Sequence, residues 1–216
     1  MPLLTGWRCR AVRPAVPEPS GGDEPEGWLG VDLGVVNLAT DSDGTNHSGK
    51  VVRVVRRRNN RLRARLQALG TESAKRLLKK RRRKESRYAR DVNHRISKAL
   101  VGVAKGTRRG IKLEDLSGIR DRVTVTKAQR SDLRSWAFRQ LRTFVSYKAA
   151  LAGVPVRPVD PRNTSRECSR CGHTDKRNRR TRDEFRCLRC GHAGPADHNA
   201  AINIGRRAAV NRPNAA

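Results

Sequence analysis

The chain has 216 residues, enough for one domain or for one domain with a small appendage. Its 49 Lys and Arg residues outnumber 20 Asp and Glu, and the resulting net charge of +29 indicates a polyanionic partner. Because no apolar stretch is long enough to span a membrane and no signal-peptide core is evident, we expect a cytoplasmic protein with no membrane association.

The first predicted elements form a short antiparallel meander. Residues 13–27 are rich in Pro, Gly and Glu, which predicts a linker. The apolar run 28–40 predicts a buried strand that ends near Asp32, followed by a return strand, and residues 41–44 have the composition of a turn. A third strand is expected over residues 50–55.

A hairpin of two basic helices is predicted next. Leucines recur at helical spacing over residues 62–69, Gly70 is placed to end that helix, and Thr71 is a candidate N-cap for the next one. A second apolar stripe covers residues 88–103. Residues 50–110 hold 23 basic and three acidic residues, a net charge of +20.

This charge predicts contacts with a nucleic-acid backbone, and the alternative is a helical face that is merely solvated. The basic residues expected to make these contacts are Arg56, Arg57, Arg58, Lys79, Lys80, Arg81, Arg82, Arg83, Arg179 and Arg180.

The rest of the chain alternates strands and helices. Residues 111–116 predict a short strand that contains Glu114, residues 130–152 an amphipathic helix, and residues 154–159 a last strand. A closing helix is expected from Asp197. This order is consistent with an α/β fold of the ribonuclease H-like type.

Four cysteines have the spacing of a metal site. Cys168 and Cys171 are separated from Cys187 and Cys190 by fifteen residues, and a glycine follows each Cys-x-x-Cys pair. This arrangement is typical of a structural Zn²⁺ ion held by four thiolates, each glycine permitting a tight turn. The alternative is that these are free or redox-active cysteines.

Three other candidate ligands are left out of this site. His173 and His192 follow the cysteine pairs and could substitute as ligands, but four thiolates already fill a structural zinc site. Cys9 has no partner in the pattern and is interpreted as an ordinary thiol.

Three acidic residues occur where strands or helices are expected to begin or end: Asp32, Glu114 and Asp197. Each one alone could be structural, as a salt-bridge partner or a helix N-cap. If the three elements converge at one end of the sheet, however, the carboxylates repel one another unless a divalent cation neutralises them. The sequence therefore predicts a divalent-cation site formed by these residues.

Several runs in this order resemble the C-terminal half of TnpB, a transposase accessory protein of insertion sequences that is related to type V CRISPR nucleases. They include residues 30–39 (GVDLGVVNLA), 91–98 (DVNHRISK), 113–116 (LEDL), the four cysteines, and residues 196–204 (ADHNAAINI). The resemblance covers roughly residues 28–208.

The resemblance implies a metal-dependent DNA endonuclease of the RuvC type, with a mixed sheet, flanking helices and an inserted zinc ribbon. Asp32, Glu114 and Asp197 match the catalytic acid positions that bind Mg²⁺. Residues 28–162 plus 196–210 are expected to form the nuclease domain, residues 163–195 the ribbon, and residues 211–216 a tail.

Members of this family normally carry a long region before the nuclease half that binds guide RNA. Only 31 residues precede Asp32 here, so we expect a shortened member in which residues 1–27 are a remnant and linker. DNA is then the expected partner, and guide RNA remains a candidate whose binding region is missing. The alternative is a non-catalytic basic zinc-ribbon protein that binds nucleic acid, either a repressor or a decaying transposon fragment. The sequence does not indicate an oligomeric state.

Overall fold

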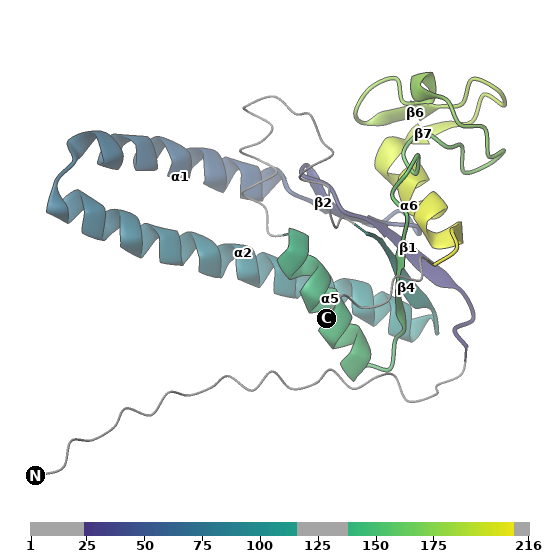
Figure 1. The fold of residues 1–216 in the computed structure, drawn as a ribbon, viewed down its shortest axis with the longest axis horizontal. Helices are drawn as coiled ribbons and strands as arrows, with labels where there is room; N and C mark the ends of the chain where they lie inside the picture. The colour runs from purple at the N-terminus through teal and green to yellow at the C-terminus, as the bar shows by residue number, and fades with distance from the viewer. Residues whose placement is uncertain (1–23, 116–137, 210–216) are drawn as a thin grey trace, which may run out of the picture.

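The structure of the protein, a computed structural model, describes residues 24–115 and 138–209. It contains a five-stranded mixed sheet in the order β3-β2-β1-β4-β5 with helices on its two faces (Figure 1). β1 pairs in parallel with β4, which pairs in parallel with β5, whereas β1, β2 and β3 form the antiparallel meander. The strands are β1 (Trp28–Asp32), β2 (Asn37–Asp41), β3 (Asn46–Ser48), β4 (Gly110–Glu114) and β5 (Val156–Val159).

Two long helices leave the sheet as an antiparallel hairpin (Figure 1). The hairpin turns at Gly70, whose left-handed φ of 64° suits glycine, and the Thr71 hydroxyl caps the second helix by accepting from the Ala74 N–H at 3.2 Å. Both predicted helix boundaries are therefore confirmed. The helices of the structure are α1 (Lys50–Leu69), α2 (Glu72–Gly106), α5 (Phe138–Leu151) and α6 (Ala196–Arg206).

The strand predicted over residues 50–55 is wrong, because α1 already begins at Lys50 and the third strand is the shorter β3. The valines of this stretch have the composition of a strand, but Val51 and Val54 are exposed and only Val52 is buried. The basic, leucine-containing sequence that follows favours a helix, and the helix extends back through the valines.

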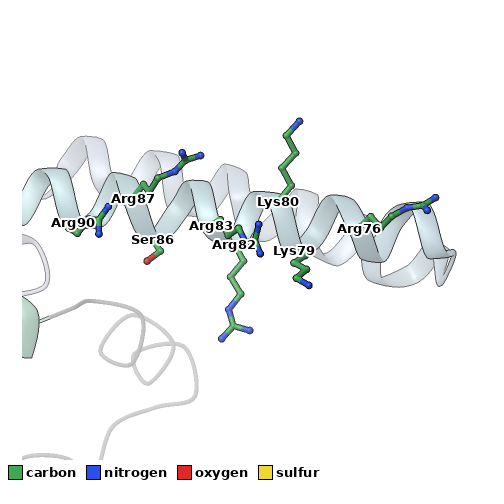
Figure 2. Close-up of a pocket in the computed structure, with 8 residues that line it drawn as sticks. All are labelled: Arg76, Lys79, Lys80, Arg82, Arg83, Ser86, Arg87 and Arg90. Atoms are coloured by element: carbon green, nitrogen blue, oxygen red, sulfur yellow. The ribbon is translucent and has the colours of Figure 1, made fainter. Parts of the chain in front are cut away.

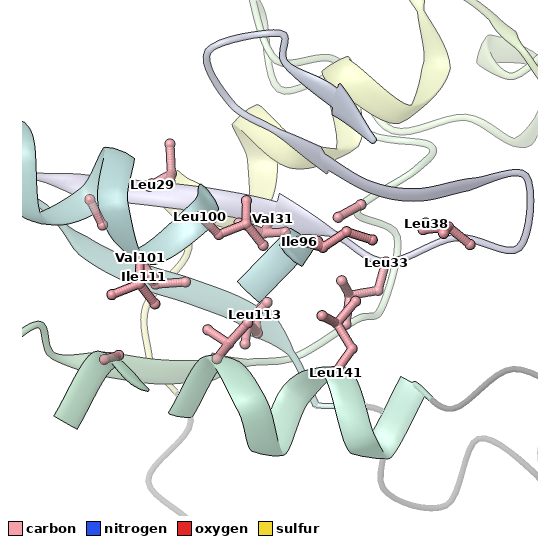
Figure 3. Close-up of a cluster of buried hydrophobic side chains, with 14 of the residues drawn as sticks. Leu29, Val31, Leu33, Leu38, Ile96, Leu100, Val101, Ile111, Leu113 and Leu141 are labelled. Carbon is pink, nitrogen blue, oxygen red and sulfur yellow. The ribbon is translucent and has the colours of Figure 1, made fainter. Parts of the chain in front are cut away.

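The core lies between the sheet and the helices α2 and α5. Side chains alternate along a strand, so Leu29 and Val31 of β1 lie on the same face as Leu113 of β4. Figure 3 shows them with Leu100 of α2 and Leu141 of α5, and all five are almost completely buried.

Helix α6 packs on the opposite face, where β1 has a glycine. A Cβ atom at Gly30 would lie within 3.0 Å of the Ala201 carbonyl oxygen and of the Gly205 backbone, so only glycine permits this approach. Lys112 of β4 lies on the same face and donates from Nζ to the carbonyls of Gly205 and Arg207 at 3.1 and 2.6 Å. These interactions fix where the helix lies on the sheet.

The stretch of chain that contains the four cysteines, residues 163–195, is called the cysteine segment, and it has a buried cluster separate from the main core. Its regular elements are a 3₁₀ turn (Lys176–Asn178) and a two-stranded sheet of β6 (Glu184–Arg186) and β7 (Ala193–Pro195). Phe185 is buried with Cys168 and Cys187 against Ala196, the first residue of α6.

Several expectations fall partly outside the described residues. These are the residues of the predicted linker before position 24, the beginning of the helix predicted over 130–152, Cys9 and the C-terminal tail. The described part of that helix is α5, and the last strand agrees with β5. No helix in the described ranges combines the length and apolar character needed to cross a membrane, although α2 has 35 residues.

Gly30→Ala is expected to destabilise the protein by about 1–3 kcal/mol, because the added methyl forces α6 away from β1. Gly102→Ala is the matched control. That position is exposed on α2 with nothing within 4 Å of an added Cβ, so the change should stabilise by about 0.5–1 kcal/mol. Chemical denaturation of both variants measures the difference, and equal effects would contradict the close packing of α6 on β1.

Candidate active site and metal centre

Two of the predicted acids lie at the carboxyl ends of neighbouring parallel strands. Val31 of β1 pairs with Leu113 of β4, so Asp32 and Glu114 are the next residues along each strand. Because side chains alternate, both acids lie on the face covered by α6. Asp197 lies in the first turn of that helix. The three acids predicted from the sequence therefore lie at the same end of the sheet, near enough for their charges to interact.

The raised pKa of Asp32 reflects burial as well as the nearby charges of the other two acids. Burial is the largest effect that raises its pKa, followed by repulsion from the charges of Glu114 and then Asp197, and the result is a pKa of about 8. The Arg179 guanidinium acts in the opposite direction but offsets only part of the shift. In the absence of a cation, Asp32 therefore holds its proton at neutral pH.

Hydrogen bonds hold the other two acids. Burial raises the pKa of Glu114, and the Thr164 hydroxyl opposes this by donating to Glu114 Oε1 at 2.6 Å. Asn37, at the start of β2, donates from Nδ2 to Asp197 Oδ2 at 2.8 Å. Asp115, the acid next to Glu114, forms an ion pair with Arg142 at 3.0 Å and so belongs to a different set of interactions.

Arg179 is the cation that pairs with Asp197 and acts to lower the pKa of Asp32. Its Nη2 donates to the Arg182 carbonyl at 2.8 Å and lies 3.3 Å from Asp197 Oδ1. The cysteine segment thus supplies a cation to the third acid, whereas the neighbouring Arg180 is exposed. Of the two arginines predicted here to contact nucleic acid, only Arg180 is on the open surface.

The four cysteines form a compact ligand group. Their sulfur atoms all lie within 4.8 Å of one another, and no histidine belongs to the group. Across residues 24–115 and 138–209, no other set of three or more His, Cys, Asp or Glu side chains gathers its ligand atoms this closely. The oxygens of the three acids are spread more widely, and they interact through their charges.

The two cysteine pairs are built on the same backbone pattern. The Cys168 N–H donates to the His173 carbonyl at 3.0 Å, and the Cys187 N–H donates to the His192 carbonyl at 2.8 Å. In each turn the glycine has a positive φ, which is 73° at Gly172 and 71° at Gly191. These are the tight turns that the spacing predicted.

Backbone donors prepare one of these sulfurs for the thiolate form. Burial acts to raise the pKa of Cys187, but the N–H groups of Cys190 and Arg189 lower it to about 7. In the same group burial raises the pKa of Cys168, and the pKa of Cys171 is raised to about 12, so it is the close spacing of the four sulfurs that matches the donor set of a tetrahedral Zn²⁺ site.

A cationic groove lies along α2. It is an open surface region lined by seven cationic side chains and a serine, all from that helix, and Figure 2 shows these side chains spreading outward from α2. Of the residues predicted to bind nucleic acid, Arg56, Arg57 and Arg58 lie on α1 and do not line it, and Arg81 donates instead to Asn59 of α1 at 3.2 Å. The lining residues are Arg76, Lys79, Lys80, Arg82, Arg83, Ser86, Arg87 and Arg90.

Some residues of these sites were missed by sequence reasoning. Arg76, Arg87 and Arg90 could have been found, because they continue the basic stripe of α2 at helical spacing. Asn37 and Thr164 could not, since each meets an acid that is 50 or more positions away along the chain, and neither residue type is unusual in a loop or at a strand end.

Two family models match the chain. One, described as a probable transposase, matches residues 12–112, and the other, the TNB domain of Cas12f1-like proteins, matches residues 138–204. The first includes Asp32, and the second includes Asp197 and all four cysteines. Glu114 lies two residues beyond the end of the first matched range.

Several relatives that the chain matches carry names from two families, Cas12f and TnpB. The chain is 38% identical over 124 residues to the CRISPR-associated endodeoxyribonuclease Cas12f1 of Sulfoacidibacillus thermotolerans, a match that covers 57% of this chain and 28% of the relative. It is 32% identical over 198 residues to the putative RNA-guided DNA endonuclease InsQ of Escherichia coli K12, covering 82% and 48%. A TnpB-like protein of Methanocaldococcus jannaschii is 38% identical over 99 residues, covering 45% and 36%. The matches span less than half the length of each relative.

Solved structures show the same fold. A cryo-EM structure of a CRISPR-Cas12f ternary complex matches 92% of this chain and 42% of its own with a TM-score of 0.70, and a Cas12f1–sgRNA–target DNA complex matches 87% and 51% with a TM-score of 0.65. Each is 22% identical in sequence. The mixed α/β fold is thus similar to that of Cas12f, and the chain belongs to the family of TnpB-like and Cas12f proteins.

Proposed function

We propose that this chain carries the nuclease centre of a metal-dependent DNA endonuclease, in which Asp32, Glu114 and Asp197 are the catalytic acids. In this proposal residues 28–162 plus 196–210 form a RuvC-type, ribonuclease H-like domain, and residues 163–195 are a zinc ribbon inserted before the third acid. DNA is the proposed substrate because InsQ and Cas12f1 are named as DNA endonucleases.

The observation that carries the proposal is the charge imbalance at the edge of the sheet. Burial and the charges of Glu114 and Asp197 raise the pKa of Asp32 to about 8, with one guanidinium to oppose them. Divalent cations bind oxygen ligands and favour ionised carboxylates, so Mg²⁺ is the group that this donor set fits. Two cations would share these ligands, so the three carboxylates need not converge on one point.

When bound, such cations supply an activated water and stabilise the leaving 3′-oxygen of a phosphodiester. The protein orients the carboxylates: Thr164 fixes one oxygen of Glu114, and Asn37 fixes one oxygen of Asp197. Arg179 lowers the repulsion among the acids. We propose that Asp32, whose charge interacts with both Glu114 and Asp197, would hold a cation together with each of them.

We propose Zn²⁺ as the structural ion of the cysteine segment, held by Cys168, Cys171, Cys187 and Cys190. The support is the close group of four sulfurs and the paired backbone turns. Four thiolates leave no open position for a water molecule, so this ion stabilises the fold and takes no part in hydrolysis.

The cationic groove is proposed to bind the phosphate backbone. Its seven cations lie on a single helix, and among the residues that the structure describes no acidic side chain lines it. Phosphate interactions of this kind position a nucleic acid without reading its sequence, so they suit DNA or a guide RNA equally.

Nicking of supercoiled DNA in the presence of Mg²⁺ tests the proposed function. The native chain should nick the plasmid, and Asp32→Ala should reduce nicking to the level seen in EDTA, because the cations lose their central ligand. Asp183→Asn, which changes an exposed carboxylate, should retain activity. Equal nicking by the native chain and Asp32→Ala, or none by either, would favour a nucleic-acid-binding protein without catalysis.

Stabilisation by Mg²⁺ should depend on pH. Because the folded pKa of Asp32 lies above the unfolded value, the metal-free protein loses stability as the pH rises from about 4 to about 8. Mg²⁺ must displace the Asp32 proton, so its apparent affinity should be on the order of fifty-fold weaker at pH 6 than at pH 8.

Thermal unfolding with and without Mg²⁺ at these two pH values measures this effect. Asp32→Asn should remove most of the Mg²⁺ stabilisation at both pH values and should make the metal-free protein more stable at pH 8. Asp183→Asn should behave like the native chain. A Mg²⁺ effect that is the same at pH 6 and pH 8 would refute the role of Asp32.

Neutralising the groove should weaken binding to nucleic acid. In the triple variant Lys79→Gln, Lys80→Gln, Arg83→Gln, the slope of log affinity against log salt concentration should become shallower by about 0.9 for each phosphate of duplex DNA that the protein no longer neutralises. Fluorescence anisotropy over a salt series measures the slope. Lys105→Gln, at the other end of α2 and outside the groove, is the control, and a similar change in slope there would contradict the assignment.

A further inference from the structure

The first turn of α6, which carries Asp197, is held by the cysteine segment. Its N-cap residue, Pro195, makes no side-chain hydrogen bond to the helix, so the usual local fixation is missing. Instead, the Ala196 N–H donates to the carbonyl of Asp183 at 2.9 Å, and Arg179 pairs with Asp197 itself. Both of these partners, Asp183 and Arg179, lie within residues 163–195.

Asn199 ties the same helix to a cysteine. Its Oδ1 accepts from the Ser169 N–H at 3.0 Å, and its Nδ2 donates to the Glu167 carbonyl at 2.8 Å. These two backbone groups belong to the residues on either side of Cys168. The Asn199 side chain is buried, and its oxygen and nitrogen both form hydrogen bonds, so it fixes the backbone on both sides of Cys168.

Asn203, one helical turn later, extends this link to Glu114. Its Nδ2 donates to the carbonyls of Thr164 and Glu167 at 2.9 and 2.7 Å. Thr164 is the residue whose hydroxyl holds Glu114. Two buried amides on one face of α6 therefore connect the backbone on both sides of Cys168 to two of the three acids.

We infer that Asn199 and Asn203 are positioning residues that couple zinc binding by the cysteine segment to divalent-cation binding by the three acids. This inference rests on the proposed function. Zinc ties Cys168 to the other three sulfurs, which orders the backbone that the two amides hold. That backbone in turn fixes the first turn of α6 and, through Thr164, the carboxylate of Glu114.

The coupling acts in both directions. A cation that binds Asp197 and Glu114 stabilises the arrangement of α6 in which Asn199 and Asn203 reach the backbone next to Cys168, and so stabilises the zinc site. Linkage requires that each ion raise the affinity for the other by the same factor, and couplings of this kind typically amount to about fivefold or more.

The test measures zinc affinity of the full chain by competition with a chromophoric chelator, with and without saturating Mg²⁺. In the native chain, Mg²⁺ should raise the zinc affinity by about fivefold or more. In Asn199→Ala and in Asn203→Ala, the effect of Mg²⁺ should fall well below that of the native chain. The Mg²⁺-induced rise in melting temperature, recorded on the same samples, shows whether Mg²⁺ binds.

Asn178→Ala is the matched control. Asn178 is also a fully buried amide, but its bonds go to Arg166, His173 and Leu188, all within the cysteine segment. This variant should bind zinc more weakly, but Mg²⁺ should still raise its zinc affinity by the full factor. The control therefore separates a general loss of zinc affinity from a loss of coupling between the two metal sites.

The outcomes distinguish the coupling from the proposed function. If Mg²⁺ raises the melting temperature of the native chain but leaves its zinc affinity unchanged, the inferred coupling is wrong and the proposed function stands. An absence of any Mg²⁺ binding would overturn both. If the two alanine variants fail to fold, the native chain measured with and without Mg²⁺ still decides whether the two sites are coupled.

Discussion

The burial of three carboxylates that also repel one another is the constraint that organises this site. Asp32 and Glu114 end adjacent parallel strands on the same face of the sheet, and Asp197 is brought to them by a helix that can approach only because residue 30 is glycine. Together with burial, the resulting field is strong enough to keep Asp32 protonated near neutral pH. Asn37, Thr164 and Arg179 each satisfy or offset part of it, so these side chains are best understood as responses to the same electrostatic cost.

Local chemistry was what the sequence predicted best. The turn at Gly70, the cap at Thr71 and the paired cysteine turns depend on residue type and spacing, and all three agree with the structure. The strand expected at residues 50–55 failed because a run of valines suits a strand or a helix, and the choice was made by the sequence that follows. The convergence of the acids could be proposed from their positions at element ends. The hydrogen bonds of Asn37 and Thr164 to these acids could not, since they depend on the tertiary fold.

The cysteine segment is inserted directly before α6, and this position has a structural reason. β7 ends at Pro195 and the helix begins at the next residue, so the chain has no slack between the cysteine turns and the third acid. Because the connection is so short, ordering the cysteine turns also restricts the backbone conformations open to the first turn of α6. The buried amides of α6 then add a second connection beside the covalent one.

The hairpin of α1 and α2 shows the opposite arrangement. In α2, the buried residues concentrate between Val92 and Ala104, next to the sheet, whereas the cations from Arg76 to Arg90 lie on the part that projects beyond it. The projecting part has few buried side chains, so it belongs to the regions where local opening requires little free energy. Different lengths of one helix thus have different tasks: the outer length carries the cations that are proposed to contact a nucleic-acid backbone, and the inner length packs on the strands that carry the acids.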